Sequence, residues 1–319
     1  MGYNLILYEK DKESGAAVIT FNKPERLNAW SGGMKTEIMY ALDDARADTD
    51  IVGVIITGAG RAFGAGGIRQ GYSGKGREGV LAEHAVSESG QVQAHYDWLP
   101  GDDERHMRLQ SYDTPHLLEE ILEFEKPTIC ALNGVVAGGQ IGLFGCCDIR
   151  IASDRGQFRL AFTRTHGVPD VTSTYWLTRL VGLAHTLEMC YTNDFLDAQE
   201  LLRIGLVNHV VPHDELIPYC KDMVKKMKQI PPLHLLASKK VIRKVVDCND
   251  VWEARMLEQW GGEAVRTHSD TAEAAKSFWE RRDPVYTGRS VFQRKYGSYE
   301  DVAARRAAAP EPAGGDPRI

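Results

Sequence analysis

Short apolar segments bounded by turn-forming residues alternate with segments of helical periodicity along the first half of the chain. Residues 51–57 and 128–132 are apolar almost throughout, which is typical of buried strands. The pattern predicts two strands, a helix and a third strand, and it recurs near 128–160. The elements of the first unit are a hairpin of 3–9 and 16–21, a helix at 33–46 and a strand at 51–57. We therefore predict an α/β fold built from successive ββα units.

A glycine-rich turn follows each of the two buried strands. After 128–132 come Gly134, Gly138 and Gly139, and residues 140–147 then form a run too apolar and too long for a loop, most simply a buried helix. Such a turn leaves main-chain N–H groups of the first helical turn unpaired at one spot, where they stabilise negative charge on an oxygen. Phosphate loops and tight packing use similar turns, but the Walker and Rossmann spacings do not occur here. The other turn, 58–67, comes earlier in the chain and favours an oxygen-binding role.

Several separated blocks of sequence carry a resemblance to a known family. They are ITFNKPERLNAW (19–30), TGAGRAFGAGG (57–67), KPTICALNGVVAGG (126–139) with CCDIRIAS (146–153), and RLVGLAHTLEMCYTNDFLDAQELLRIGLVNHVVP (179–212). Taken in this order, they resemble the crotonase (enoyl-CoA hydratase/isomerase) superfamily over about residues 3–286. The resemblance implies a crotonase-type spiral of ββα units with a C-terminal helical oligomerisation region.

Composition and the resemblance together divide the chain into three predicted parts. Residues 1–202 are expected to form the core with the acyl-CoA site, and the polar, irregular stretch 71–113 to be a variable insert or lid over the acyl group. Residues 203–287 are expected to form a helical domain, which in the family docks neighbouring subunits into a homotrimer or a hexamer (dimer of trimers). The tail 288–319 is rich in Ala, Pro and Gly and is predicted to be flexible. The helices expected after Pro212 are 215–229, 232–248, 251–268 and 272–281.

Charge and cysteine usage exclude several classes of function. The 319-residue chain has a formal net charge of −6 and no dense basic run, which argues against a nucleic-acid partner. No segment has the length of a membrane span or the form of a secretory signal, so we expect a cytoplasmic protein without a membrane partner. The six cysteines show no metal-type C-x-x-C spacing. We expect buried, reduced thiols and no metal site.

The resemblance implies an acyl-CoA substrate whose thioester oxygen is held by two main-chain N–H groups. The matching positions are Gly67, which follows Ala65 and Gly66, and Gly139. Such donors stabilise an enolate or a tetrahedral oxyanion. Coenzyme A is thus expected as part of the substrate, and no prosthetic group is expected. Gln140 stands where a third glycine is common, which predicts a side-chain amide near the acyl group.

Two further segments match regions that approach coenzyme A in the family. Arg26, Asn28 and Ala29 match a loop in which a basic side chain and main-chain atoms meet the pantetheine and phosphates. A solvated loop arginine explains Arg26 equally well. Three lysines match a C-terminal helix that can approach the nucleotide, although an ordinary charged helix face has the same pattern. These lysines are Lys239, Lys240 and Lys244.

The side chains that perform hydration in the family are missing. Hydratases place one glutamate in the helix after the second glycine turn and another about twenty residues later. The matching residues here are Gly142 and Phe162, and neither can transfer a proton. The sequence therefore argues against hydration by two glutamates.

Asp170 is the remaining candidate for chemistry. Dienoyl-CoA isomerases and the 4-chlorobenzoyl-CoA dehalogenase carry a catalytic Asp at the matching position. Flanking by Val168, Pro169 and Val171 predicts partial desolvation, which raises a carboxyl pKa and suits proton transfer. The alternative is a helix N-cap, because Asp followed by Val-Thr-Ser-Thr and an apolar run is typical of one.

Three functional hypotheses follow. The first is an enoyl-CoA hydratase/isomerase-like enzyme, an isomerase or lyase, in which Asp170 is the acid/base. The second is an acyl-CoA hydrolase that cleaves a carbon–halogen or carbon–carbon bond, with Asp170 as nucleophile or water activator. His166 is a second candidate catalytic residue, because some β-diketone hydrolases carry histidines here, although a loop histidine is more often simply solvated. The third is a non-catalytic crotonase-fold binding protein.

Overall fold

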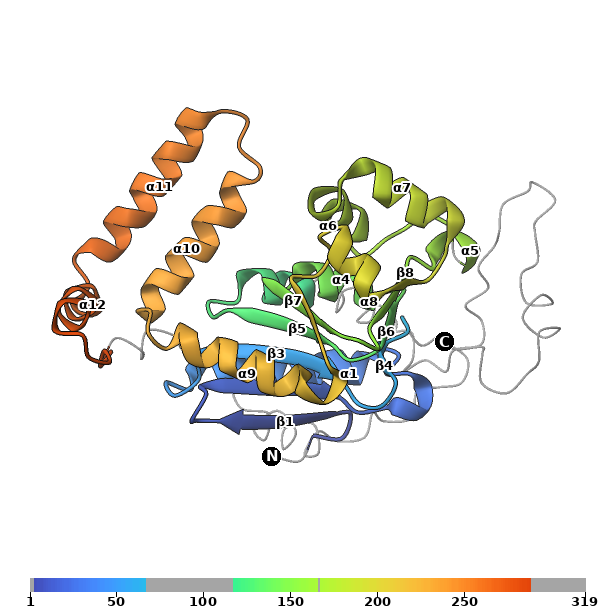
Figure 1. Cartoon of the computed structure of the whole chain (residues 1–319), viewed down its shortest axis with the longest axis horizontal. Helices are drawn as coiled ribbons and strands as arrows, with labels where there is room; N and C mark the ends of the chain where they lie inside the picture. The colour runs from blue at the N-terminus through green and yellow to red at the C-terminus, as the bar shows by residue number, and fades with distance from the viewer. Residues whose placement is uncertain (1–2, 67–116, 166, 288–319) are drawn as a thin grey trace, which may run out of the picture.

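The computed structural model describes residues 3–66, 117–165 and 167–287, and it contains two β-sheets (Figure 1). In the six-stranded sheet only the first pair is antiparallel, and the other neighbours are parallel. Its strands, in spatial order, are β1 (Ile6–Asp11), β2 (Ala16–Phe21), β3 (Gly53–Gly58), β5 (Thr128–Leu132), β7 (Ile149–Ser153) and β10 (His209–Val211). The four-stranded sheet consists of β4 (Ala62–Gly64), β6 (Val135–Ala137), β8 (Gln157–Arg159) and β9 (Leu196–Asp197).

The chain winds as a spiral because successive strands alternate between the two sheets. β3, β5 and β7 lie in the larger sheet, and each is followed within a few residues by β4, β6 or β8 in the smaller one. The predicted hairpin and both buried strands are confirmed. Gly66 follows β4 and Gly138 follows β6, so parallel pairing of β4 with β6 brings these two glycines to one edge. The predicted spiral of ββα units is thus the observed architecture.

Both faces of the larger sheet are covered, as parallel strands require. Alternate residues of each strand point to opposite faces: Ile55 and Ile129 pack with one core cluster, and Ile56 and Cys130 with the other. α9 (Leu216–Met227) covers the first of these faces with Leu216, Cys220 and Val224. The opposite face packs against α1 (Gly32–Ala47) and α4 (Gln140–Cys146).

The remaining helices surround this core or stand away from it. They are η1 (Pro24–Arg26), residues 117–123, α5 (Phe162–Thr165), α6 (Ser173–Leu180), α7 (Gly182–Thr192), α8 (Ala198–Arg203), η2 (His213–Glu215), α10 (Pro232–Val245), α11 (Val251–Arg266) and α12 (Ser269–Glu280). α11 and α12, coloured orange to red, stand away from the sheets in Figure 1, whereas α10 contacts the core. None of the helices in the described ranges is both long and apolar enough to cross a bilayer.

The predicted division into parts stays a prediction. α9 belongs to the predicted helical part, yet it packs on the sheet of the core. The insert 71–113 and the tail 288–319 lie outside the described residues.

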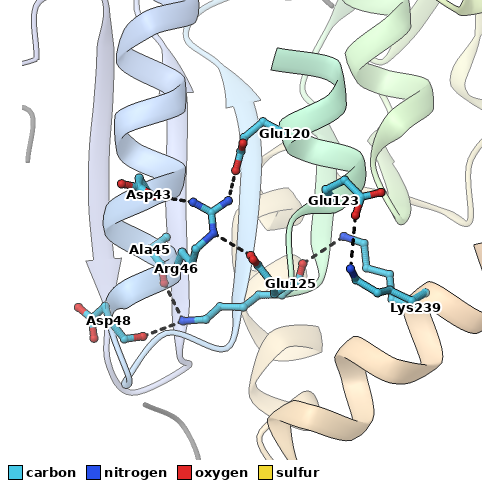
Figure 2. Close-up of polar contacts among 10 residues, drawn as sticks. Asp43, Ala45, Arg46, Asp48, Glu120, Glu123, Glu125 and Lys239 are labelled. Carbon is cyan, nitrogen blue, oxygen red and sulfur yellow. Dashed lines mark hydrogen bonds and ion pairs between the residues drawn. The ribbon is translucent and has the colours of Figure 1, made fainter. Parts of the chain in front are cut away.

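A buried group of charges joins α1 to the helix at 117–123 (Figure 2). The Arg46 guanidinium donates to Asp43 Oδ1 at 2.5 Å, to Glu125 Oε2 at 2.8 Å and to Glu120. Arg46, Asp43 and Glu120 are almost fully buried. Lys126 continues the connection, because its Nζ donates to main-chain carbonyls at the C-terminal end of α1. These bonds hold residues 117–123 against the core, next to α4.

Candidate functional site

The two glycine turns meet at one point of the structure. A Cβ on Gly66 would lie 3.4 Å from Gly138 Cα and 3.5 Å from Gly139 N, and a Cβ on Gly138 would lie 3.0 Å from Gly66 Cα. Both Gly66 and Gly138 have positive φ, so glycine suits both the conformation and the close approach. Within the described ranges, no group accepts a hydrogen bond from the Gly139 N–H. The Gly67 amide lies outside those ranges, so the pair of donors stays a prediction.

Gln140 connects the two turns and does not present its amide to the site. The side chain is fully buried, its Oε1 accepts the Gly66 N–H, and its Nε2 donates to Asn28 O at 2.8 Å. The close packing requires glycine at 64, where a Cβ would lie 2.6 Å from Gln140 Cδ. The expectation that this amide lies near the acyl group stays a prediction, and the main chain already bonds both of its ends.

Asn28 shapes the 23–29 loop rather than offering a side chain to a ligand. Its Oδ1 accepts Lys23 N–H at 2.9 Å, and its Nδ2 donates to Ala59 O at 2.9 Å and to Ala62 O at 2.7 Å. The residue is buried and has a φ of 54°, a conformation that asparagine tolerates better than most residues. The first of these bonds closes the loop on itself, and the other two hold it on the first glycine turn.

The other predicted coenzyme A contacts lie beside this turn. Arg26, in η1, and Ala65 are exposed, and Ala29 is half-buried. Ala65 N–H donates to Leu27 O at 3.0 Å, which fixes the turn to the same loop. The loop thus keeps its predicted place next to the glycine turns, and no described contact assigns the Arg26 side chain to a ligand or to a structural role.

Asn133 is a further residue of the site that the sequence reasoning missed. Its Oδ1 accepts Gly58 N–H at 3.1 Å, and its Nδ2 donates to Gly60 O at 2.9 Å. It thereby ties the second turn to the first. Gly134, the next residue, has no room for a side chain, since a Cβ would lie 2.1 Å from Arg61 O. An amide directly after an apolar strand and before a glycine was the signal available in the sequence.

Of the two positions expected to match the hydratase glutamates, 142 has no room for a side chain and 162 lies in the core. A Cβ on Gly142 would lie 2.3 Å from Val171 O and 3.3 Å from Leu118 Cδ1. Phe162 lies in the hydrophobic core, only 3% exposed. The space that a side chain at 142 needs is filled by a main-chain carbonyl of another segment.

Asp170 lies in an exposed turn just before α6. Thr172 occupies the N-cap position of that helix, so the N-cap interpretation of Asp170 is wrong. The Asp170 carbonyl accepts Ser173 N–H at 3.0 Å and the Ser173 hydroxyl at 2.6 Å. The expected desolvation by flanking residues is also not observed, because Val168 is 79% exposed. His166, the second catalytic candidate, lies outside the described residues.

One of the predicted nucleotide-contacting lysines is part of a half-buried ion cluster. Asp148 Oδ2 lies 2.9 Å from Lys239 Nζ, and Asp148 Oδ1 lies 2.7 Å from Arg243 Nη2. Burial raises the Asp148 carboxyl pKa, but the two cations outweigh it and hold that pKa below its usual value. Burial lowers the Lys239 pKa, and Asp148 offsets this only in part. Lys239 thus attaches α10 to the core, whereas Lys240 and Lys244 are exposed.

Comparisons with known proteins cover most of the chain. A profile of the family described as enoyl-CoA hydratase/isomerase matches residues 11–99 and 99–289. A short-chain-enoyl-CoA hydratase of Clostridium acetobutylicum is 30% identical over 281 residues, 88% of this chain and 95% of that protein. A 4-chlorobenzoyl coenzyme A dehalogenase of an Arthrobacter species is 28% identical over 217 residues, 68% of this chain and 70% of that protein. The crystal structure of an enoyl-CoA hydratase from Bacillus anthracis matches with a TM-score of 0.73 and 25% identity, over 89% of this chain and 100% of that one.

Proposed function

This chain belongs to the enoyl-CoA hydratase/isomerase family of the crotonase superfamily, and from that premise we propose that it is an enzyme acting on an acyl-CoA thioester. The observation that carries the proposal is the meeting of the two glycine turns, with the Gly139 N–H unbonded within the described ranges. We place the thioester oxygen between this N–H and that of Gly67. Main-chain donors fixed in advance stabilise the charge that develops on the oxygen, and losing one such donor costs about 10²–10³ in rate. Coenzyme A enters as part of the substrate, and the reaction needs no prosthetic group.

Asp170 is proposed as the group that moves the proton. This is supported by the lack of room for a side chain at 142, by the burial of Phe162 and by the exposure of Asp170 just before α6. In an isomerisation, Asp170 takes a proton from one carbon of the acyl chain, the electron pair moves into the enolate held at Gly139, and the proton returns to another carbon. A bound acyl group would exclude water from the carboxylate and raise its pKa toward the working range.

The alternative is hydrolysis, and the similarity to the 4-chlorobenzoyl coenzyme A dehalogenase favours it. In a dehalogenation, the Asp170 carboxylate attacks the ring carbon, halide leaves, and water then cleaves the resulting ester. In a carbon–carbon cleavage, Asp170 takes a proton from water, the hydroxide adds to a carbonyl carbon, and the carbon–carbon bond breaks as an enolate leaves and is protonated. A third alternative is a binding protein without catalysis, suggested by the absence of both hydratase glutamates. Which of these reactions the protein performs depends on the acyl group that it accepts, so the substrate must be found by assay.

The test uses enoyl-, dienoyl-, aryl- and cyclic β-keto-acyl-CoA esters with the wild type, Asp170→Asn and the control Asp194→Asn. Asp194 is another exposed loop carboxylate and should be replaceable without loss. General acid–base catalysis contributes about 10²–10⁴, so Asp170→Asn should lower turnover by at least roughly 10². Solvent deuterium entering at the α-carbon of an enoyl- or dienoyl-CoA supports enolate chemistry, and release of halide from a haloaryl-CoA supports displacement. Full turnover by Asp170→Asn would remove Asp170 from the mechanism, and ester binding without turnover of any class would favour the binding protein.

We also propose that the protein is a homotrimer or a pair of trimers. The support is an exposed apolar stripe on α11, formed by Trp252, Met256 and Trp260 at successive helical turns, and Trp279 on α12, which is 81% exposed. Large exposed apolar patches are typical of protein interfaces. Light scattering after size exclusion should give three or six times the 35.5 kDa chain mass. The double variant Trp252→Glu, Trp260→Glu should shift the mass toward the monomer, and a monomeric wild type would contradict the proposal.

A further inference from the structure

Helix α4 and the turn before α6 touch at a place where only a hydrogen atom fits. The Val171 carbonyl oxygen would lie 2.3 Å from a Cβ on Gly142, far closer than such atoms approach in proteins. Any side chain at 142 would therefore push this carbonyl away by well over half an ångström. Gly142 lies one helical turn before Cys146 on α4. The contact joins α4 to the turn that begins with Asp170.

The turn itself has a conformation that its own residues disfavour. Val171 has a φ of 49° and Thr172 a φ of 59°, so two β-branched residues in succession are left-handed. Such residues pay a steric cost there, and the conformation persists only where surrounding contacts impose it. The contacts here are the bonds of Ser173 to the Asp170 carbonyl and the close packing of Val171 O against Gly142.

We propose that Gly142 is a positioning residue for Asp170. By presenting no side chain, it lets the Val171 carbonyl rest on α4, and this holds the turn in its left-handed form and sets where the Asp170 carboxylate stands. Gly142 stands at the position that matches a catalytic glutamate in hydratases. Here it would act indirectly, by fixing the turn that carries Asp170. The inference rests on the proposed role of Asp170 in proton transfer.

The test compares Gly142→Ala with the matched variant Gly261→Ala. A Cβ on Gly261 of α11 would lie 2.5 Å from Val241 Cγ2, so this change is also a crowded glycine-to-alanine replacement in a helix, but outside the site. Gly142→Ala should lower kcat by about 10²-fold, the typical effect of misplacing a catalytic group by about 1 Å, and should leave KM nearly unchanged. It should also shift the pH profile of kcat, because the surroundings of the carboxylate change. Gly261→Ala should lower thermal stability and leave kcat and its pH profile unchanged.

The double variant Asp170→Asn, Gly142→Ala shows whether the effect passes through Asp170. If it does, adding Gly142→Ala to Asp170→Asn causes no further loss of kcat. A full additional loss, or wild-type kcat and pH profile in Gly142→Ala alone, would overturn the positioning role while Asp170 remained catalytic. Wild-type turnover by Asp170→Asn would instead refute the proposed function.

If Gly142→Ala yields no folded protein, Ser173→Ala tests the same turn through its contact with α6. Removing the hydroxyl releases the Asp170 carbonyl, so kcat should fall by roughly tenfold with a shifted pH profile and little change in KM. Unchanged kcat would overturn the inference. Gly142→Glu, which restores the hydratase residue in sequence, should show no hydration of enoyl-CoA, because the Val171 carbonyl occupies the place of its side chain.

Discussion

Replacing Arg46 with methionine should destabilise the protein strongly. Arg46 is 4% exposed and donates to Asp43, Glu120 and Glu125, of which the first two are almost completely buried. Methionine keeps much of the volume but removes the guanidinium from buried carboxylates that are then costly to keep charged. Removing one partner from such a buried group of charges lowers the free energy of unfolding by about 3–5 kcal/mol. The helix at 117–123, which carries Glu120 and the Leu118 contact with α4, should be the first part to loosen.

The measurement is thermal and urea unfolding followed by circular dichroism. At about 2–4 °C per kcal/mol for a chain of this class, the expected loss corresponds to a midpoint lower by roughly 6–20 °C. Arg203→Met is the matched control, because Arg203 pairs with Glu200 at 2.5 Å on the exposed surface of α8. Exposed pairs contribute little, so the midpoint of this variant should not move.

Two outcomes bear on the reasoning. If Arg46→Met lowers the midpoint no more than Arg203→Met, the buried charges do not depend on the guanidinium and the argument is refuted. Adding Glu120→Gln to Arg46→Met should recover part of the stability, because it removes one of the buried charges left behind. A further loss in the double variant would show that Glu120 is held mainly by other contacts.

Two further predictions concern the supports of the site. Gln140→Met leaves main-chain groups of Gly66 and Asn28 unbonded and should cost about 1–3 kcal/mol of stability for each. It should also weaken binding of acyl-CoA in calorimetry. The exposed control Gln259→Met should change neither stability nor binding, and equal behaviour of the two variants would contradict the connecting role. Asp148 has a pKa held below the ordinary 3.8, so the stability it contributes is fully present above that pH and is lost as the pH falls through the lower, folded value. Asp148→Asn should therefore be less stable at neutral pH and lose less stability during acid titration below 3.8, and parallel acid curves for the two proteins would refute the assignment.

The glycine turns and the elements around them could be predicted from the sequence because their signals are local. The strand at 128–132, the hairpin and the helices after Pro212 each follow from a run or a periodicity within one segment, and the structure places them within a few residues of the expected bounds. The absence of proton-transferring side chains at Gly142 and Phe162 is likewise a matter of residue identity. These properties need no knowledge of what another segment does.

The supports of the site required the tertiary structure. Gln140 bonds residues 74 and 112 positions away, and periodicity in one segment carries no information about contacts at that separation. The exposure of Asp170 was misjudged for the same reason, since apolar neighbours in sequence desolvate a carboxylate only if they fold over it, and Val168 points to solvent.

The sequence by itself thus determined the order of strands, glycine turns and helices, and which side chains are absent from the site. Only the tertiary structure decided that a carbonyl from Val171 fills the space above Gly142 and that amide side chains hold the two turns together. The physical reason is that residue type and spacing set local conformation and burial, whereas steric closure and main-chain hydrogen bonding depend on segments that meet only after the chain has folded.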